Sequence, residues 1–473
     1  MRFFQFIVVC GLLATGWGAR AATGGSPATN TITWHRATGM VDAEVHGCPL
    51  MPLLEGIAQE TGWHVFVEPG ADRKASTRFH DQPVGDALRL LLGSLNFAFV
   101  PQTNGPDFLY VFTTRMEAAT KAVKVVKAGP PKHVANQLIV KIKPGADIDA
   151  IAKSVGAKVI ARNDKLHIYK LEFGDAASTD AALGELKNNS DVLAVDYNYQ
   201  YDAPPEGQVL PNTAAATPTL SLNPPTQDNP CSPIIGLIDT PVQLQGNSSD
   251  QFLLKQLYVA GDPTQSGGSV QTKQSVSGGS GASGVAPLHG TAMYQSILYA
   301  MSQQGKTTSS QILAVDVYGG NTTTTSWDVA LGIQAAIDGG ASVLNMSLGS
   351  SGDSAVLDSI VQDAASRGIV MYAAAGNQPV DTATYPAAIP GVTAVTALQN
   401  GQIAPYADYG SFVALALPGA NAISFNNVTY GFQGTSVATA LATGVAAGVK
   451  GVNCGTWTQI QSAMQQKFGF TGK

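Results

Sequence analysis

The chain has 473 residues, of which 44% are hydrophobic and 13% are charged, and its formal net charge is -6. This length allows two to four domains, and the composition is typical of a compact α/β enzyme and excludes a largely disordered chain. The negative charge balance argues against a nucleic-acid-binding protein. After the amino-terminal segment, no uninterrupted apolar span approaches the roughly 18 residues of a transmembrane helix.

The chain begins with a targeting segment. Met1 and Arg2 precede a largely apolar run over residues 3–13, and Ala19-Arg20-Ala21 places small residues where a signal peptidase cuts. We therefore expect residues 1–21 to be a signal peptide and the mature chain to be exported, either to a periplasm or to the medium. A membrane anchor is not favoured because the apolar run is short.

Residues 31–115 are predicted to form a small α+β domain. The hydrophobic pattern indicates strands at 41–46, 63–68, 97–101 and 108–113, and helices at 49–61 and 84–95. This order, with apolar helix segments at 53–58 and 86–92, resembles the short amino-terminal domain of secretins and TonB-dependent receptors. The resemblance implies an interaction module with an envelope protein partner, and a Gram-negative source. A solvated linker is expected over residues 116–132.

Residues 133–202 are predicted to form a second small α+β domain. Strands are indicated at 138–142, 158–160, 166–173 and 192–195, and helices near 147–155 and 179–188. The resulting β-α-β-β-α-β order is ferredoxin-like. Residues 203–230 are rich in proline and free of aromatic side chains, so we expect an exposed connector.

Residues 231–473 are predicted to form a larger α/β domain. Apolar strands at 234–239, 312–317, 342–346, 369–374 and 392–396 alternate with helical stretches near 326–338 and 354–367. Such alternation implies a doubly wound, mostly parallel sheet with helices on both faces. The insertion at 261–284 is rich in Gly and Ser, which favours a surface loop over a lid.

Four polar residues stand at the ends of these predicted elements. Asp239 closes one apolar strand, His289 and Ser436 each open a helical run, and Asn377 follows another strand. Each alone has an ordinary structural interpretation, but the order Asp, His, Ser is one that a catalytic triad uses. Imidazole must accept the serine proton, and carboxylate must orient the imidazole. Asn377 is then the candidate donor to an oxyanion.

These segments resemble the subtilases, the subtilisin-like serine peptidases, over residues 231 to 470. The resemblance is carried in order by Ile238-Asp239-Thr240, His289-Gly290-Thr291, Asn345-Met346-Ser347-Leu348-Gly349, Ala374-Ala375-Gly376-Asn377, Tyr385-Pro386-Ala387, Leu417-Pro418-Gly419 and Gly434-Thr435-Ser436. It implies that Asp239 orients and stabilises the charged imidazole, His289 is the base, Ser436 is the nucleophile and Asn377 donates to the oxyanion. Pro241, the segment 292–295 and Ala440-Leu441 depart from the usual family residues and indicate a divergent branch.

The same resemblance implies where substrate binds. Ser347-Leu348-Gly349 resembles the strand that pairs with the substrate backbone, and with Ala374-Ala375-Gly376 it would wall the first specificity pocket. Small, uncharged walls favour a bulky apolar or aromatic residue before the cut.

Residues 133–202 resemble the subtilase propeptide. This implies an inhibitor of the enzyme whose carboxyl-terminal tail enters the cleft as the first product of self-cleavage, with the cut falling within 203–230. We therefore expect an exported zymogen of a serine endopeptidase that acts on protein or peptide substrates.

No cofactor is expected to be required. The segment from Met301 to Gln311 offers few charged oxygens, so we expect no tight calcium site there, and calcium dependence elsewhere stays open. The spacing of the cysteines suggests no zinc site.

Three cysteines remain after removal of the signal peptide: Cys48, Cys231 and Cys454. They allow at most one intramolecular disulfide. A bridge between Cys231 and Cys454 would join the two ends of the α/β domain, which suits an oxidising compartment. Two unpaired structural cysteines are the open alternative.

A second functional interpretation stays open at this stage. The chain could be a periplasmic binding or assembly module in which residues 31–115 act and the peptidase domain processes only itself or is inactive. A lipase or esterase is less favoured, because no Gly-x-Ser-x-Gly elbow surrounds Ser436.

Overall fold

The computed structural model describes residues 31–35, 39–101, 107–123, 131–210, 222, 229–259, 271–273, 276–277, 286–305, 308–380 and 382–470. The predicted signal peptide lies outside these residues. The chain divides into two compact units, residues 1–128 and 129–473.

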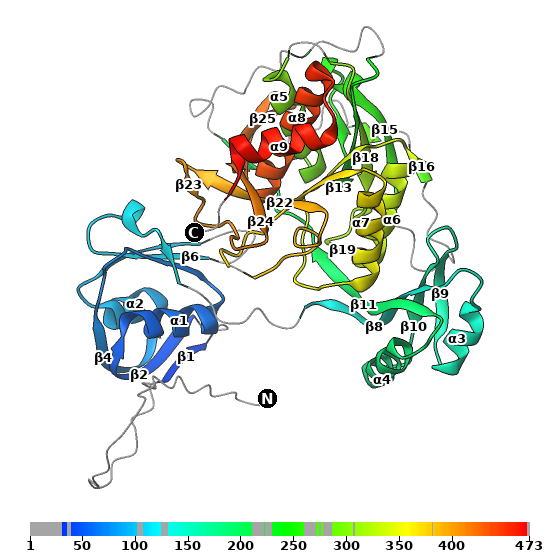
Figure 1. The fold of residues 1–473 in the computed structure, drawn as a ribbon. Helices are drawn as coiled ribbons and strands as arrows, with labels where there is room; N and C mark the ends of the chain where they lie inside the picture. The colour runs from blue at the N-terminus through cyan, green and yellow to red at the C-terminus, as the bar shows by residue number, and fades with distance from the viewer. Residues whose placement is uncertain are drawn as a thin grey trace, which may run out of the picture. The chain divides into compact units, whose positions relative to one another are not determined.

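The first unit contains two sheets and two helices (Figure 1). Its elements are β1 (Thr31–His35), β2 (Met40–Pro49), α1 (Leu50–Thr61), β3 (His64–Val67), β4 (Lys74–Pro83), α2 (Val84–Leu92), β5 (Asn96–Val100), β6 (Phe108–Phe112), η1 (Met116–Ala118) and β7 (Lys121–Ala122). The sheets have the orders β1-β2-β4 and β5-β6-β3-β7. The apolar faces of α1 and α2 bury leucines in a core shared with both sheets.

Three features of this unit differ from the sequence-based expectation. The strand β1 was not expected, and of its five residues only Ile32 is buried. The strand β4 was not expected, because only Ala75 and Phe79 of its ten residues are buried and its other side chains are mostly polar. Part of the expected linker also belongs to the unit, since β7 pairs antiparallel with β3. The resemblance to the secretin and TonB domain stays a prediction.

The second unit begins with a small domain of four antiparallel strands and two helices. Its elements are β8 (His133–Ile142), α3 (Ile148–Ser154), β9 (Lys158–Asn163), β10 (Ile168–Glu172), α4 (Ala176–Lys187) and β11 (Val192–Asp202). The strand order β11-β8-β10-β9 confirms the ferredoxin-like prediction. Asp147 and Asp175 cap the two helices by accepting backbone N–H groups, which fixes where each helix begins.

The rest of this unit is the doubly wound α/β domain. Its elements are β12 (Gln208–Val209), β13 (Ile234–Asp239), β14 (Gln243–Leu244), η2 (Ser248–Phe252), β15 (Leu253–Tyr258), β16 (Gln271–Lys273), β17 (Val276–Ser277), α5 (His289–Ser302), β18 (Gln311–Asp316), β19 (Thr323–Thr325), α6 (Ser326–Asp338), β20 (Val343–Met346), α7 (Ala355–Ser366), β21 (Val370–Ala374), β22 (Val392–Gln399), β23 (Gln402–Ile403), β24 (Val413–Pro418), β25 (Ala420–Phe425), β26 (Val428–Gln433), α8 (Thr435–Asn453) and α9 (Trp457–Phe468).

The central strands β15, β18, β13, β20, β21, β22 and β24 lie next to one another in that order and pair in parallel. Most of their residues are apolar because successive side chains enter two different cores, whereas β15 carries the exposed Lys255. Leu237 of β13 packs into the core that contains α5 and α8, whereas Ile238 packs into the core that contains α6 and α7. Helices therefore cover both faces, which confirms the predicted fold class.

The sequence also led us to expect a surface loop at 261–284 and no membrane-spanning helix in this domain. The insertion at 261–284 lies partly outside the described residues, and its described part forms the short strands β16 and β17. Within the part of the chain that the structure describes, one helix, α8, is long and apolar enough to cross a membrane, but 72% of its most apolar window is buried inside the protein.

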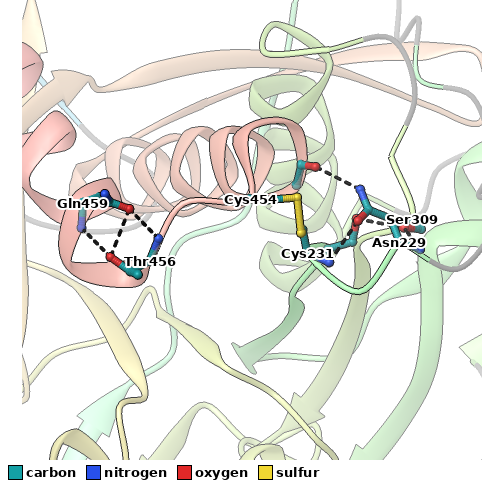
Figure 2. Close-up of a disulfide and its surroundings, with 8 residues drawn as sticks. Asn229, Cys231, Ser309, Cys454, Thr456 and Gln459 are labelled. Atoms are coloured by element: carbon teal, nitrogen blue, oxygen red, sulfur yellow. Dashed lines mark hydrogen bonds between the residues drawn. A yellow bond between two sulfur atoms is a disulfide. The ribbon is translucent and has the colours of Figure 1, made fainter.

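A disulfide joins Cys231 to Cys454, so the bridged alternative is the one observed (Figure 2). The bridge links the residue that leads into β13 with the residue that ends α8. Beside it, the side chain of Asn229 donates to the carbonyl oxygen of Gly451 at 3.0 Å. Both ends of the α/β domain are thus tied together. Cys48 of the first unit is buried.

The strand β11 attaches the ferredoxin-like domain to the α/β domain. Asn198 accepts from the backbone N–H of Trp327 at 3.2 Å, and Asp196 accepts from that of Ala355 at 2.7 Å. These two side chains satisfy N–H groups at the starts of α6 and α7. The Tyr201 side chain is fully buried in the core formed around those helices. This contact therefore combines a buried aromatic side chain with direct hydrogen bonds, as specific interfaces do, although the Tyr201 hydroxyl is buried without a hydrogen-bond partner among the described residues.

Candidate active site

Asp239 is the last residue of β13 and is 1% exposed. The backbone N–H of Thr240 donates to its Oδ1 at 2.7 Å, and the Thr240 hydroxyl accepts from the N–H of Gly290 at 2.8 Å. A Cβ on Gly290 would lie 2.0 Å from the carbonyl oxygen of Thr240. Only glycine permits this close approach, which brings the start of α5 against the end of β13.

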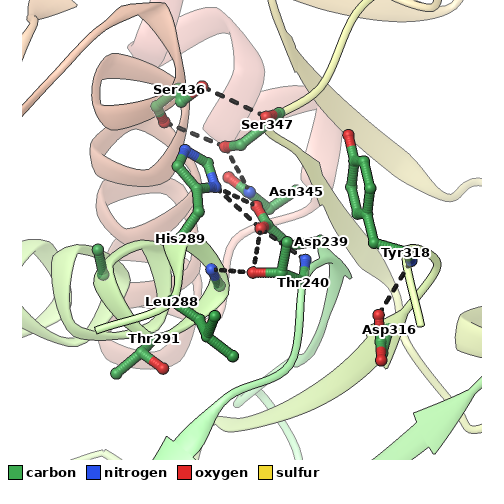
Figure 3. Close-up of polar contacts among 12 residues, drawn as sticks. Asp239, Thr240, Leu288, His289, Thr291, Asp316, Tyr318, Asn345, Ser347 and Ser436 are labelled. Carbon is green, nitrogen blue, oxygen red and sulfur yellow. Dashed lines mark hydrogen bonds and ion pairs between the residues drawn. The ribbon is translucent and has the colours of Figure 1, made fainter. Parts of the chain in front are cut away.

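His289, the first residue of α5, faces the Asp239 carboxylate. Its Nδ1 lies 2.8 Å from Oδ1 and 3.0 Å from Oδ2 of Asp239, and both side chains are buried (Figure 3). A carboxylate at Nδ1 keeps the proton on that nitrogen and leaves Nε2 as the basic atom. Figure 3 shows the imidazole ring between Asp239 and Ser436.

Ser436 is the second residue of α8. Its hydroxyl donates to the carbonyl oxygen of Ser347 at 3.3 Å, and the Ser347 hydroxyl donates to the carbonyl oxygen of Ser436 at 3.1 Å. Gly434 just before the helix adopts φ +149, a conformation that L residues rarely adopt. In the first turn of α8, the N–H groups of Thr435, Val437 and Ala438 are bonded to Asn377 and Gly434. The N–H of Ser436 itself is therefore the group of this turn that could donate to an anion.

Asn377 follows β21, the strand next to β20 in the sheet. Its Oδ1 accepts from the backbone N–H of Thr435 at 2.9 Å and from the Thr435 hydroxyl at 3.1 Å. With Oδ1 engaged in this way, the amide Nδ2 is the group left to donate to a ligand beside Ser436.

The predicted pocket segments meet at the same edge of the sheet. Ser347-Leu348-Gly349 follows β20, and Ala374-Ala375-Gly376 ends β21, which pairs in parallel with β20. A Cβ on Gly349 would lie 2.6 Å from the Thr384 side chain, so the wall is closely packed at that point. The structure therefore brings all the predicted site residues to one region.

Sequence reasoning missed three contributors to this region: Thr435, Tyr318 and Asp408. Thr435 fixes the Asn377 amide, and its place before the serine was visible in the sequence. Tyr318 lies near Asp239, and its hydroxyl donates to the carbonyl oxygen of Asp202 at 3.3 Å (Figure 3). Asp408 was recognisable only as a lone acid in an otherwise uncharged stretch at 403–413.

The tail of the ferredoxin-like domain contacts two segments of the α/β domain, one before β19 and the other β26. The N–H of Ala203 donates to the carbonyl oxygen of Thr322 at 2.8 Å. Five residues later, Gln208 of β12 pairs with Gly431 of β26, the strand that leads into Ser436. A Cβ on Gly207 would lie 2.3 Å from the Phe432 ring. The segment 204–206 therefore joins a contact with Thr322, just before β19, to a pairing with β26, the strand that leads into Ser436.

Among the described residues, no group of three or more His, Cys, Asp or Glu side chains could hold a metal ion.

Comparison with known proteins agrees with this fold. Residues 232–470, half of the chain, match the Subtilase family, and residues 119–198 match the fervidolysin N-terminal prodomain. The chain therefore belongs to the subtilase family. It is similar in structure to fervidolysin from Fervidobacterium pennivorans, described as a keratinolytic enzyme related to subtilisin, with a TM-score of 0.55 and 18% identity, covering 71% of this chain and 57% of that one.

Two curated relatives share part of the sequence. M-protease from Shouchella clausii is 36% identical over 171 residues, which are 36% of this chain and 45% of that protein. Subtilisin Savinase from Lederbergia lenta is 36% identical over 160 residues, which are 33% of this chain and 59% of that protein. The chain thus spans about half the length of these relatives.

Proposed function

We propose that the protein is an exported serine endopeptidase made as a zymogen, with residues 133–202 as its inhibitory propeptide. The observation that carries the proposal is the buried pairing of His289 Nδ1 with Asp239 beside Ser436 at a helix start. Membership in the subtilase family supports peptide bonds as the substrate.

The mechanism follows from the positions of four side chains. After rotation of its hydroxyl toward His289, Ser436 loses its proton to Nε2 as Oγ attacks a peptide carbonyl carbon. Asp239 stabilises the resulting imidazolium. The Asn377 amide and the N–H of Ser436 donate to the oxyanion. His289 then protonates the leaving amine, and water hydrolyses the acyl-enzyme by the same route. No cofactor enters these steps.

The same cleft supports a substrate preference. The walls at 347–349 and 374–376 carry no charged side chain, so a bulky apolar or aromatic residue before the cut fits them best. The binding-module alternative is not favoured, because the site retains each side chain that the chemistry needs. A partner for residues 31–115 in the cell envelope stays part of the proposal.

The path of the tail supports self-cleavage within a narrow segment. Residues 204–206 lie between the contact of Ala203 with Thr322 and the pairing of Gln208 with Gly431. Two of their peptide bonds, Ala203–Pro204 and Pro204–Pro205, have a proline ring on the leaving nitrogen. Such a nitrogen has no N–H, and its ring restricts the preceding residue. We therefore expect the first cut at Pro205–Glu206 or Glu206–Gly207. This cut is intramolecular, so the position of the tail decides it and not the preference of the pocket for an apolar residue.

Intact mass measured over time after purification tests this prediction. The parent should shorten to a product that begins at Glu206 or Gly207, whereas Ser436→Ala should lose only its signal peptide. Pro204→Ala/Pro205→Ala should add cuts one or two residues earlier. Its matched control, Pro224→Ala/Pro225→Ala, changes the second proline pair of the connector and should leave the product unchanged. A first product that begins after Leu210 would contradict the proposed path.

The contact between the propeptide and the α/β domain should weaken as the pH rises. Asp358 of α7 faces β11, near Asp353 and Asp196, and its Oδ1 is buried without a hydrogen-bond partner among the described atoms. Burial, together with these two carboxylates, raises the pKa of Asp358 to about 6. The contact thus favours the protonated acid, and its stability falls as the pH rises from the ordinary pKa of 3.8 through about 6.

Thermal unfolding of the uncut Ser436→Ala chain at pH 5 and pH 8 checks this expectation. Asp358→Asn should reduce the difference in melting temperature between the two pH values. The other charged group that lines this cleft is Lys187, which stays unchanged in every variant. Asp363→Asn, on an exposed position of the same helix, is the control and should leave the difference as it is. Equal differences in all three chains would refute a role for Asp358.

A further inference from the structure

Behind the candidate oxyanion donor lies a buried carboxylate, Asp408, which is 2% exposed. We propose that Asp408 is a positioning residue for the reaction, which holds the backbone on both sides of Asn377 so that the Asn377 amide points at the oxyanion. This inference rests on the proposed function of the site.

The side chain of Asp408 binds the backbone just after Asn377. Its Oδ1 accepts from the N–H of Gln378 at 2.6 Å and from that of Val380 at 3.3 Å. Its Oδ2 accepts from the Thr384 hydroxyl at 3.4 Å. Three donors from residues 378–384 therefore converge on one carboxylate, which fixes the course of this loop.

The residue just before Asn377 is bound to Asp408 as well. The N–H of Asp408 donates to the carbonyl oxygen of Gly376 at 2.9 Å. Gly376 has φ +117, and a Cβ there would lie 2.1 Å from Oδ2 of Asp408. The glycine is thus required both for its backbone conformation and for the close approach of the carboxylate. Asn377 is the residue between these two anchors.

The orientation of the Asn377 amide then depends on two contacts of different kinds. Thr435 holds its side-chain oxygen, and Asp408 holds its backbone through Gly376 and Gln378. Preorganised donors act because they are already aimed at the position where charge develops. The charged form of this carboxyl group is destabilised by its surroundings, since burial raises the pKa of Asp408 to about 7. Strongly perturbed acids that also have a specific geometric role gather at functional sites.

A double-mutant cycle with Asn377 tests the inference. Asp408→Ala should lower kcat roughly 10- to 100-fold with KM changed by less than about 3-fold, because the displaced amide serves mainly the transition state. In the Asn377→Ala background, where no amide is left to position, the same change should lower kcat by less than about 3-fold. Asp408→Asn keeps an oxygen that can accept from Gln378 and should restore most of the activity.

Asp316 provides the matched control for this cycle. Its carboxylate also accepts two backbone N–H groups of the following loop, from Tyr318 and Gly319 at 2.9 Å each. Asp316→Ala should lower kcat by the same factor whether residue 377 is asparagine or alanine. If Asp408→Ala fails to fold, Asp408→Ser, whose hydroxyl is too short to reach Gln378, takes its place in the cycle.

The outcomes separate this inference from the proposed function. Equal losses for Asp408→Ala in both backgrounds, with an active parent, would show that Asp408 is merely structural and overturn the inference alone. A parent with no turnover and no reaction with a serine-directed phosphonate would overturn the proposed function itself.

Discussion

Replacement of Ser436 by alanine is expected to lower kcat on an unfolded protein substrate by about 10⁶-fold, the size known for loss of the nucleophile in subtilisin, a member of this family. The change removes the hydroxyl that we propose as the nucleophile, which bonds the carbonyl oxygen of Ser347 in this structure. Small residual turnover would remain from the oxyanion donors and substrate binding. Steady-state kinetics with the processed parent enzyme and the variant are the measurement, with the variant chain cut by an added protease to the same product.

Ser366→Ala is a suitable control for this change. Ser366 lies at the end of α7 and donates to the carbonyl oxygen of Asp363, remote in the chain from every predicted site residue. Its loss should leave kcat and KM unchanged. Turnover by Ser436→Ala within about 10-fold of the parent would be incompatible with a triad built on this serine.

The second large effect concerns Asn377. Asn377→Ala is expected to lower kcat by about 10² to 10³, or about 2.7–4 kcal/mol, with little change in KM, as for the corresponding amide in subtilisin. The reason is that Nδ2 donates to the oxyanion, which forms only in the transition state, whereas the ground-state carbonyl gains little from it.

Asn377→Asp distinguishes lost donation from lost packing. The aspartate keeps the size of the side chain and an oxygen that can accept from Thr435, but it has no N–H to offer. We expect it to be at least as slow as the alanine variant. Recovery of activity by aspartate would mean that Asn377 serves the packing of the loop and not the oxyanion.

Much of the fold could be predicted from the sequence because its elements have strong local signals. The central strands are apolar runs such as residues 234–239, and they alternate with helices, so a parallel sheet was expected. The predicted order of strands and helices in the ferredoxin-like domain also agrees with the structure. The prediction missed the strand β4, because its buried face carries only Ala75 and Phe79 and its sequence shows no clear alternation of apolar and polar residues.

In the candidate site, too, some residues could be predicted from local sequence pattern and others could not. Asp239 ends a strand, Asn377 follows one, and His289 and Ser436 lie in the first turn of a helix. Chain order and local pattern were therefore enough to select them. Asp408 and the pairing of Gln208 with Gly431 depend on contacts between segments far apart in the sequence. Local pattern carries no information about such contacts. The pairing of Cys231 with Cys454 also stayed open until the structure brought the two ends of the domain together.

The most direct test of the proposed triad is reaction with a serine-directed phosphonate, followed by intact mass, peptide mapping and turnover on an unfolded protein. The processed parent should gain one adduct, on Ser436, and lose turnover in proportion to it. His289→Ala should react far more slowly, and Ser436→Ala should not react. An adduct at another residue, or full turnover by a parent that stays unmodified under conditions that label subtilisin, would contradict the account.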